Sequence, residues 1–391
     1  MCNWFTVNFP RSVVAWAALV AVGLATTASA QQEQWLEYHT SHEAKAYRWL
    51  EITTNAPAGV ALPKLNAAPL FARWTTPMDP AGGRWLCLDR ARKSGIYDRL
   101  FIDSNGNGRL DDDPPVDTQQ RTENTAEFNA VRVLFKGEDG PIAYHLGFRF
   151  YQFSGEDKRL LAQSAGWYEG RVKIGDKQRR IELIDGNVNG AFSDQSMNPA
   201  DCDRVVVDGD KAGQRYLGRM LEVDGQLFRI EVARDGAFLK VQKAEGIVFG
   251  QVRVPETISE FAAVGPNGHF VRQPVKGELT LPVGQYRINR WEIDRKDDRG
   301  AAWTLSGSGF NETASFSVAA DQPATLDIGE PMRGMLQTSE AGSEVAFSLR
   351  FQGRTGESIQ MLRGGERPRG PRLTLASRGG SYRGTNYFEF G

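Results

Sequence analysis

The chain has 391 residues, with 47 basic against 48 acidic side chains and a formal net charge of −1 at pH 7. A charge so nearly balanced gives no electrostatic basis for binding nucleic acid or an anionic membrane surface, and neither is expected as a partner. Hydrophobic residues make up 40% of the chain, and its 42 glycines point to many turns rather than long helices. The length suffices for about two or three domains.

The N-terminus has the three parts of a secretory signal peptide. Arg11 precedes an apolar run from Val13 to Ala25, and Ala28-Ser29-Ala30 follows it. We therefore predict a signal peptide over residues 1–30, cleaved after Ala30, and export to the periplasm, the cell surface or the medium. The apolar run is short for a membrane span and no second one follows, so no transmembrane segment is expected in the mature chain.

Only one segment after the signal peptide has helical spacing. Ser41 is a possible cap for a helix over Ser41–Ile52, in which Ala44, Tyr47 and Leu50 recur on one face.

From Asp98 onward the pattern is that of antiparallel sheet, with short β-branched and aromatic runs between Gly, Asn and Asp turns. The strands expected in this part are Ala130–Phe135, Tyr144–Phe153, Gly170–Ile174, Arg180–Ile184, Arg204–Val207 and Leu227–Val232. Asp224-Gly225 and Asp235-Gly236 lie between such runs, which is a strong hairpin signal.

A change of pattern near Gly246 predicts a domain boundary. A strand is expected over Ile247–Val254, strand-turn-strand over Leu279–Asn289, and further strands over Thr313–Ile328 and Met335–Gly391. We predict a mainly β fold of antiparallel sheets and β-sandwiches with little helix beyond the signal peptide. Residues 31–245 would form the first domain, 246–330 a sandwich module, and 331–391 a further strand segment that belongs to the same sandwich or stands alone.

An internal repeat follows two of the apolar runs. Asp103-Ser-Asn-Gly-Asn-Gly108 and Asp185-Gly-Asn-Val-Asn-Gly190 agree at positions one, three, five and six, and each has an apolar residue at position eight and an Asp at position ten. A third copy at Asp208-Gly-Asp210 lacks the Asn at position five and resembles a decayed relative.

The repeated pattern suits calcium, which takes six to eight oxygen ligands, with a glycine at position six for the sharp turn. The first loop offers oxygens from Asp103, Asn105, Asn107, the Arg109 carbonyl, Asp111 and Asp112. The second offers oxygens from Asp185, Asn187, Asn189, the Ala191 carbonyl and Asp194. These loops resemble the calcium loops of EF-hands, dockerins and thrombospondin type 3 repeats. They depart from the EF-hand because position twelve is Pro114 or Ser196 instead of Glu, and because the flanks are expected to be strands.

The same residues also suit metal-free turns, since Asn-Gly between apolar runs is a hairpin signal and Asp and Asn stabilise turns by local hydrogen bonds. Both interpretations stay open at this point.

Other candidate sites are weaker. Cys87 and Cys202 would either pair in an oxidising compartment or remain separate buried thiols. His39 and His42 lack the spacing of a zinc helix, and no nucleophile elbow, phosphate loop or dinucleotide fingerprint is present. Five tryptophans offer either sugar-stacking platforms or core anchors, with the core favoured: Trp74, Trp85, Trp167, Trp291 and Trp303.

Residues 246–391, with Leu281-Pro-Val-Gly-Gln-Tyr-Arg-Ile288, are similar to carboxypeptidase-regulatory-like sandwich modules of exported bacterial proteins. The whole arrangement resembles secreted proteins of planctomycete-type bacteria, a likeness that implies no activity. We therefore expect an exported, calcium-binding structural or interaction protein, with a cell-surface protein or polysaccharide as its conceivable partner. The alternatives are a carbohydrate-binding or carbohydrate-active protein and a metal-free structural β-protein.

Overall fold

The computed structural model describes residues 32–41, 43–66, 68–92, 94–154, 157–209, 214–311, 314–342 and 344–389. The predicted signal peptide lies outside these residues. Within them the regular structure is almost entirely β-strand, and the helical element is one short 3₁₀ turn, Pro199–Asp201. The mainly β, antiparallel fold predicted from the sequence is confirmed. In the described part of the chain, no helix has the length and apolar character needed to cross a membrane.

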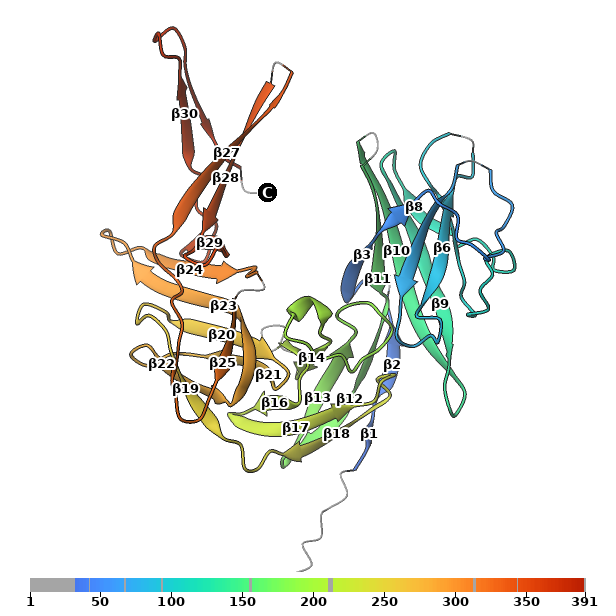
Figure 1. The fold of residues 1–391 in the computed structure, drawn as a ribbon, viewed down its shortest axis with the longest axis horizontal. Coiled ribbons are helices and arrows are strands. Elements are labelled where there is room, and N and C mark those ends of the chain that lie inside the picture. Colours follow the sequence, from blue (N-terminus) through green and yellow to red (C-terminus); the bar gives the residue numbers. More distant parts are fainter. Residues whose placement is uncertain are drawn as a thin grey trace, which may run out of the picture. The chain divides into compact units, whose positions relative to one another are not determined.

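The first half of the chain forms four sheets, drawn in blue to yellow in Figure 1. One has the order β3 (Ala46–Leu50), β11 (Asp157–Ser164), β10 (Pro141–Ser154), β9 (Thr125–Lys136) and β8 (Thr118–Arg121). A second has the order β15 (Arg215–Tyr216), β14 (Arg204–Val207), β13 (Lys177–Ile184), β12 (Gly166–Ile174) and β2 (Glu37–Thr40). A third has the order β4 (Ile52–Thr53), β5 (Leu70–Thr75), β6 (Gly83–Asp89) and β7 (Arg99–Ile102). The fourth has the order β1 (Gln34–Trp35), β18 (Phe238–Lys243), β17 (Gln226–Val232) and β16 (Met220–Val223).

The later strands form three further sheets. The small one consists of β22 (Glu278–Pro282), β19 (Phe249–Arg253) and β26 (Ala324–Thr325). The large one has the order β21 (Gly268–Arg272), β20 (Glu260–Gly265), β23 (Gly284–Lys296), β24 (Ala302–Ser308), β29 (Ser358–Arg363), β28 (Glu344–Gln352) and β27 (Arg333–Ala341), with β25 (Ser315–Val318) paired to β23. The last is the hairpin of β30 (Arg372–Ala376) and β31 (Arg383–Tyr387), coloured red in Figure 1. Strands from residues 331–391 thus continue a sheet begun by residues 260–308.

Local turn chemistry explains the hairpin between β16 and β17. Asp224 and Gly225 have φ of 51° and 73°, and positive φ at both central residues defines the type I′ turn that matches the twist of paired strands. The Asp-Gly signal in the sequence therefore predicts this connection correctly. Leu279–Asn289 also forms two strands, but β22 and β23 belong to different sheets, so Val283 connects two sheets rather than two neighbours.

The helix predicted over Ser41–Ile52 is wrong. The segment forms β3 and β4 instead, and β3 pairs antiparallel with β11, placing Ala46 opposite Ser164 and Leu50 opposite Leu160. Ala46 and Leu50 are buried while Tyr47 and Trp49 are exposed. The spacing of Tyr47 and Leu50 suits a helix, but the backbone hydrogen bonds offered by the open edge of β11 decide the conformation.

A single aromatic centre holds the sheets of the first half together. Trp74 is fully buried and stacks on Tyr144, with 5.8 Å between ring centroids and 10° between planes. Its Nε1 donates a hydrogen bond of 2.7 Å to the carbonyl of Val188, in the connection between β13 and β14. A second hydrophobic cluster surrounds Trp291 and Tyr286 in the later sheets. Trp74 and Trp291 are therefore core anchors.

Replacing Trp74 by Phe should lower the free energy of unfolding by about 2–4 kcal/mol, because it leaves the Val188 carbonyl without its donor and opens a void. Urea unfolding followed by circular dichroism measures the change. Trp85→Phe, on the neighbouring strand and only partly buried, is the control and should cost much less. Equal losses in the two variants would contradict the role given to the Trp74 hydrogen bond.

Candidate metal centre

Each of the two repeated loops begins directly after the last residue of a β-strand. Loop 1, residues 103–113, follows β7, and loop 2, residues 185–194, follows β13 and leads toward β14. The apolar residue at position eight is buried in each, as Leu110 and Phe192. Strands rather than helices flank the loops, as the sequence predicted.

The two loops share one backbone conformation. Position four has positive φ in both, as Gly106 (77°) and Val188 (54°), and so does position six, as Gly108 (79°) and Gly190 (89°). Val188 is β-branched and fully buried, and such a residue adopts positive φ only where its surroundings enforce it. The sequence repeat is therefore also a structural repeat.

The first Asp of loop 1 organises the backbone that follows it. Asp103 Oδ1 accepts from the amides of Gly106 (2.7 Å) and Asn107 (3.1 Å), and Oδ2 accepts from that of Gly108 (2.9 Å). The amides of Asn107 and Arg109 in turn donate to Asn105 Oδ1 and Asn107 Oδ1. Alternate side chains of the loop are thereby held on one side of it.

Loop 2 repeats these contacts and adds one from the core. Asp185 accepts from the amides of Asn189 (3.2 Å) and Gly190 (2.7 Å), and Asn189 Oδ1 accepts from the amide of Ala191 (2.8 Å). The Tyr144 hydroxyl also donates to Asp185 Oδ2, at 2.7 Å. Loop 2 is thus hydrogen-bonded to the aromatic centre through both Tyr144 and Trp74.

The acid at position ten closes each loop. Asn107 Nδ2 donates to Asp112 Oδ2 at 2.6 Å, and Asn189 Nδ2 donates to Asp194 Oδ2 at the same distance. Asn187 Nδ2 also donates to Asp194 Oδ2, at 3.0 Å. The position-five Asn therefore contacts the position-ten Asp in both loops, and in loop 2 the position-three Asn contacts it as well.

Loop 2 gathers buried negative charge. Asp185 is fully buried and Asp203 is 1% exposed. Burial raises the pKa of Asp185 to about 6, against the lowering effect of the Tyr144 and backbone hydrogen bonds. Burial, followed by repulsion from Asp185 and Asp194, raises the pKa of Asp203 well above its ordinary value. Within the described residues, no ion pair joins any of these three carboxylates to Lys or Arg.

Within the described part of the chain, Asn187 Oδ1 of loop 2 is buried without a hydrogen-bond partner. Asn187, Asn189 and Asp194 line a pocket of about 530 Å³, whose other wall includes Tyr47 and Arg48 of β3. Buried polar oxygens normally have a partner, and an unpaired one calls for an explanation such as an ion. Together with the buried carboxylates, this oxygen provides the kind of oxygen ligands that a hard cation such as calcium binds.

Some predicted ligands point elsewhere. Asp111 pairs with Arg109 Nη2 at 2.7 Å, beside the cluster rather than within it. In the third copy Asp208 has φ of 57° and pairs with Arg179, as in an ordinary hairpin turn, and Asp210 lies outside the described residues. Among the residues that the structure describes, no group of three His, Cys, Asp or Glu is arranged to hold a metal. Any site in these loops would need the amide and carbonyl oxygens as well.

Two further acids fasten the ends of the loops. Asp203 accepts from the amides of Gly186 (3.0 Å) and Asp194 (2.7 Å), and so fastens the two ends of loop 2. Asp113 accepts hydrogen bonds from the backbone amide and the hydroxyl of Ser104, which is position two of loop 1. Burial raises the pKa of Asp113. Asp203 directly precedes β14, outside both Asp-x-Asn-x-Asn-Gly loops, so the repeat gave it no role. No local signal identifies it as a partner of loop 2.

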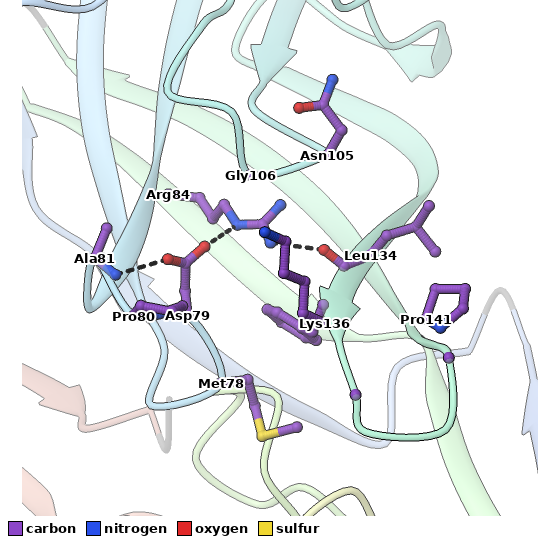
Figure 2. Close-up of a pocket in the computed structure, with 13 residues that line it drawn as sticks. Met78, Asp79, Pro80, Ala81, Arg84, Asn105, Gly106, Leu134, Lys136 and Pro141 are labelled. Atoms are coloured by element: carbon purple, nitrogen blue, oxygen red, sulfur yellow. Dashed lines mark hydrogen bonds and ion pairs between the residues drawn. The ribbon is translucent and has the colours of Figure 1, made fainter.

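A pocket of about 560 Å³ lies beside loop 1. Figure 2 shows Arg84 at its centre, between Asp79 and the backbone of Leu134, with Gly106 alongside. Arg84 Nε donates to Asp79 at 2.6 Å, and its Nη atoms donate to the carbonyls of Asp103 (3.0 Å) and Leu134 (2.7 Å). This buried guanidinium holds the start of loop 1 against β9.

The cysteines and histidines have structural surroundings. Cys87 and Cys202 are separate buried thiols, and burial raises the pKa of each. Burial lowers the pKa of His145, and that of His269 to about 4. His42 lies outside the described residues.

The chain matches no protein-family model, and neither a curated protein nor a solved structure is significantly similar to it. Functional inference therefore rests on the residues of the chain itself.

The buried acids of loop 2 predict an unusual dependence of stability on pH. An Asp whose pKa rises on folding holds its proton more tightly in the folded chain, so its contribution to stability falls as pH rises. For Asp185 the window extends from the unfolded value near 3.9 to about 6. In chelator, wild type should lose stability between pH 4 and 7, and Asp203→Asn should lose less, because it removes one of the two buried acids that titrate.

Urea unfolding at each pH measures this difference. Asp208→Asn changes a carboxylate paired at the surface with Arg179 and should keep the wild-type pH profile. Parallel profiles for wild type and Asp203→Asn would show that the buried acids do not set the dependence.

Proposed function

We propose that this chain is an exported protein whose two Asp-x-Asn-x-Asn-Gly loops bind calcium, and that calcium stabilises long connections of a structural or interaction protein. The observation that carries the proposal is in loop 2, where, among the described residues, buried Asp185 and Asp203 have no basic partner and Asn187 Oδ1 has no hydrogen bond. A cation would compensate the negative charge of Asp185 and Asp203, and Asn187 Oδ1 would be one of its ligands.

The residues fit calcium better than a softer metal, because every available donor is oxygen. In loop 2 the ligands would be Asp185, Asn187, Asn189, Asp194 and the Ala191 carbonyl. In loop 1 they would be Asp103, Asn105, Asn107, Asp112 and the Arg109 carbonyl. The shared hydrogen bonds of the two loops support one coordination scheme for both. Asp111 is left out of it because Arg109 holds its carboxylate.

A structural role is favoured over signalling. The loops lack the Glu at position twelve, and strands held in sheets flank them, so no helix pair is available to open. Extracellular calcium modules bind at about 0.1–1 mM. If each loop binds calcium with a dissociation constant of ~0.1 mM, calcium at about 1 mM would add roughly 1.4 kcal/mol per loop to the free energy of unfolding.

Isothermal titration with calcium tests the proposal. Heat should saturate in the range of about 0.1–1 mM, and the double variant Asp112→Asn/Asp194→Asn should lose most of it. These two acids are less buried than Asp185, so the variant should fold. Asp111→Asn/Asp208→Asn removes the same number of charges outside the two clusters and should bind as wild type does.

No heat at millimolar calcium, or equal heat in the two double variants, would contradict calcium binding. Thermal melting with calcium and with chelator gives an independent readout, since a ligand that binds only the folded state raises the melting temperature.

The proposal of export rests on the pattern of residues 1–30. In a bacterial host, N-terminal sequencing of the exported protein should give Gln31 as the first residue. Leu19→Arg places a charge within the apolar run and should leave the protein uncleaved inside the cell, whereas Leu19→Ile should be exported normally. Exported protein that still begins at Met1 would contradict cleavage after Ala30.

A further inference from the structure

Figure 1 shows the sheet that contains β3, β11 and β10. Its solvent-exposed face carries four aromatic side chains. We define the aromatic face as Tyr47 and Trp49 of β3 with Tyr151 and Phe153 of β10. Tyr47 is 68% exposed, Phe153 54% and Trp49 46%. Ala46 and Leu50 point to the core instead. Apolar rings so exposed and so close together usually mark a binding surface.

Three of the four rings, from β3 and β10, contact one another across β11. The ring centroids of Trp49 and Tyr151 are 5.6 Å apart, and those of Tyr151 and Phe153 are 5.4 Å apart with parallel planes. Leu161 of β11 lies opposite Trp49 in the strand register and is 7% exposed. The Arg159 guanidinium lies 5.2 Å from the Phe153 ring and 6.0 Å from the Trp49 ring. These contacts hold the rings of Trp49, Tyr151 and Phe153 in place before any ligand arrives.

The aromatic face continues into a polar pocket at the edge of β3. Tyr47 belongs to both, since it also lines the pocket of about 530 Å³ beside loop 2. The side chains that line this pocket are chiefly hydrogen-bonding groups: Arg48, Asn187, Asn189, Asp194, Gln195 and Asp201. Amide, carboxylate and guanidinium groups offer both donors and acceptors.

The aromatic face together with the polar pocket favours some classes of ligand over others. A sugar ring presents a C–H face, which packs on an aromatic ring, and hydroxyl edges, which need donors and acceptors together. Tyr47 and Trp49 are two residues apart on one strand, about 7 Å, so successive rings of an extended sugar chain can lie along them. A protein partner would favour an apolar pocket at the centre of its interface, and here the pocket is polar.

The charges on the aromatic face are paired. Arg149 lies 2.8 Å from Glu127, and Arg159 lies 3.1 Å from Asp157. An anionic chain would find no surplus of positive charge on this face. We infer that the aromatic face and the adjoining polar pocket form a binding site for a neutral glycan chain. The rings belong to the sheet, and Arg48, Gln195 and Asp201 of the pocket lie outside the proposed calcium ligands, so these groups can bind a glycan whether or not calcium holds Asn187, Asn189 and Asp194.

Affinity electrophoresis of the purified protein tests this site, with mixed-linkage β-glucan, xylan and galactomannan in native gels and with pelleting on cellulose and chitin. At least one of these should bind, and Trp49→Ala and Tyr47→Ala should each weaken binding about three- to tenfold. Trp35→Ala is the matched control, because Trp35 is 66% exposed but lies on β1, away from the aromatic face. Circular dichroism confirms that each variant is folded.

The inference is overturned if none of the five glycans binds, if Trp35→Ala weakens binding as much as Trp49→Ala, or if polygalacturonate alone binds. It is also overturned if sedimentation shows self-association that Trp49→Ala abolishes, since the face would then bind a second copy. Repeating the gels in calcium and in chelator separates the two proposals. If the protein binds a glycan but gives no heat on titration with calcium, only the calcium proposal is contradicted. If it gives heat with calcium but binds no glycan, only the glycan proposal is contradicted.

Discussion

The structure of the first half depends on how the chain accommodates the buried carboxylates of Asp185 and Asp203. Each is surrounded by hydrogen-bond donors that are uncharged, namely backbone amides and, for Asp185, the hydroxyl of Tyr144. Such donors lower the cost of a buried negative charge but do not remove it. Tyr144 in turn packs on Trp74, which donates to Val188 of the same loop. The aromatic core and loop 2 therefore stabilise one another, and a loss in either weakens both.

The two loops have the same local geometry in different surroundings. Asp185 is fully buried, whereas in loop 1 Arg109 offsets part of the negative charge through Asp111, and Asp112 is substantially exposed. A cation in loop 2 would relieve a larger electrostatic penalty, and one in loop 1 would exchange more readily with solvent. Arg84, which donates to the carbonyl of Asp103, fastens loop 1 to β9 without any ion. Among the residues that the structure describes, no basic side chain pairs with the acids of loop 2, so a bound cation would affect the conformation of loop 2 more than that of loop 1.

Much of the fold could be predicted from short-range patterns. Alternation marked β10, β13 and β14, and Asp224-Gly225 marked a type I′ turn, because these signals depend on neighbouring residues alone. The local hydrogen bonds of loop 1 were also predictable, since neighbouring Asp and Asn residues of one loop make them. Asp203 was not, because its contact with Gly186 arises from the pairing of β13 with β14 and from the path of the chain between them. Tyr144 was missed for the same reason: it reaches Asp185 from a different sheet.

The error over Ser41–Ile52 has a wider consequence. In a helix, Tyr47 and Leu50 would share one face and Trp49 would lie on another. In β3, Tyr47 and Trp49 share the solvent face and Leu50 enters the core. Whether this segment becomes a helix or a strand depends on β11, which comes much later in the chain and whose edge offers backbone groups for hydrogen bonding. That pairing creates the aromatic face, and it also brings Tyr47 and Arg48 beside loop 2. A surface suited to a sugar chain and a loop suited to a cation thus become neighbours because an edge strand formed where local spacing favoured a helix.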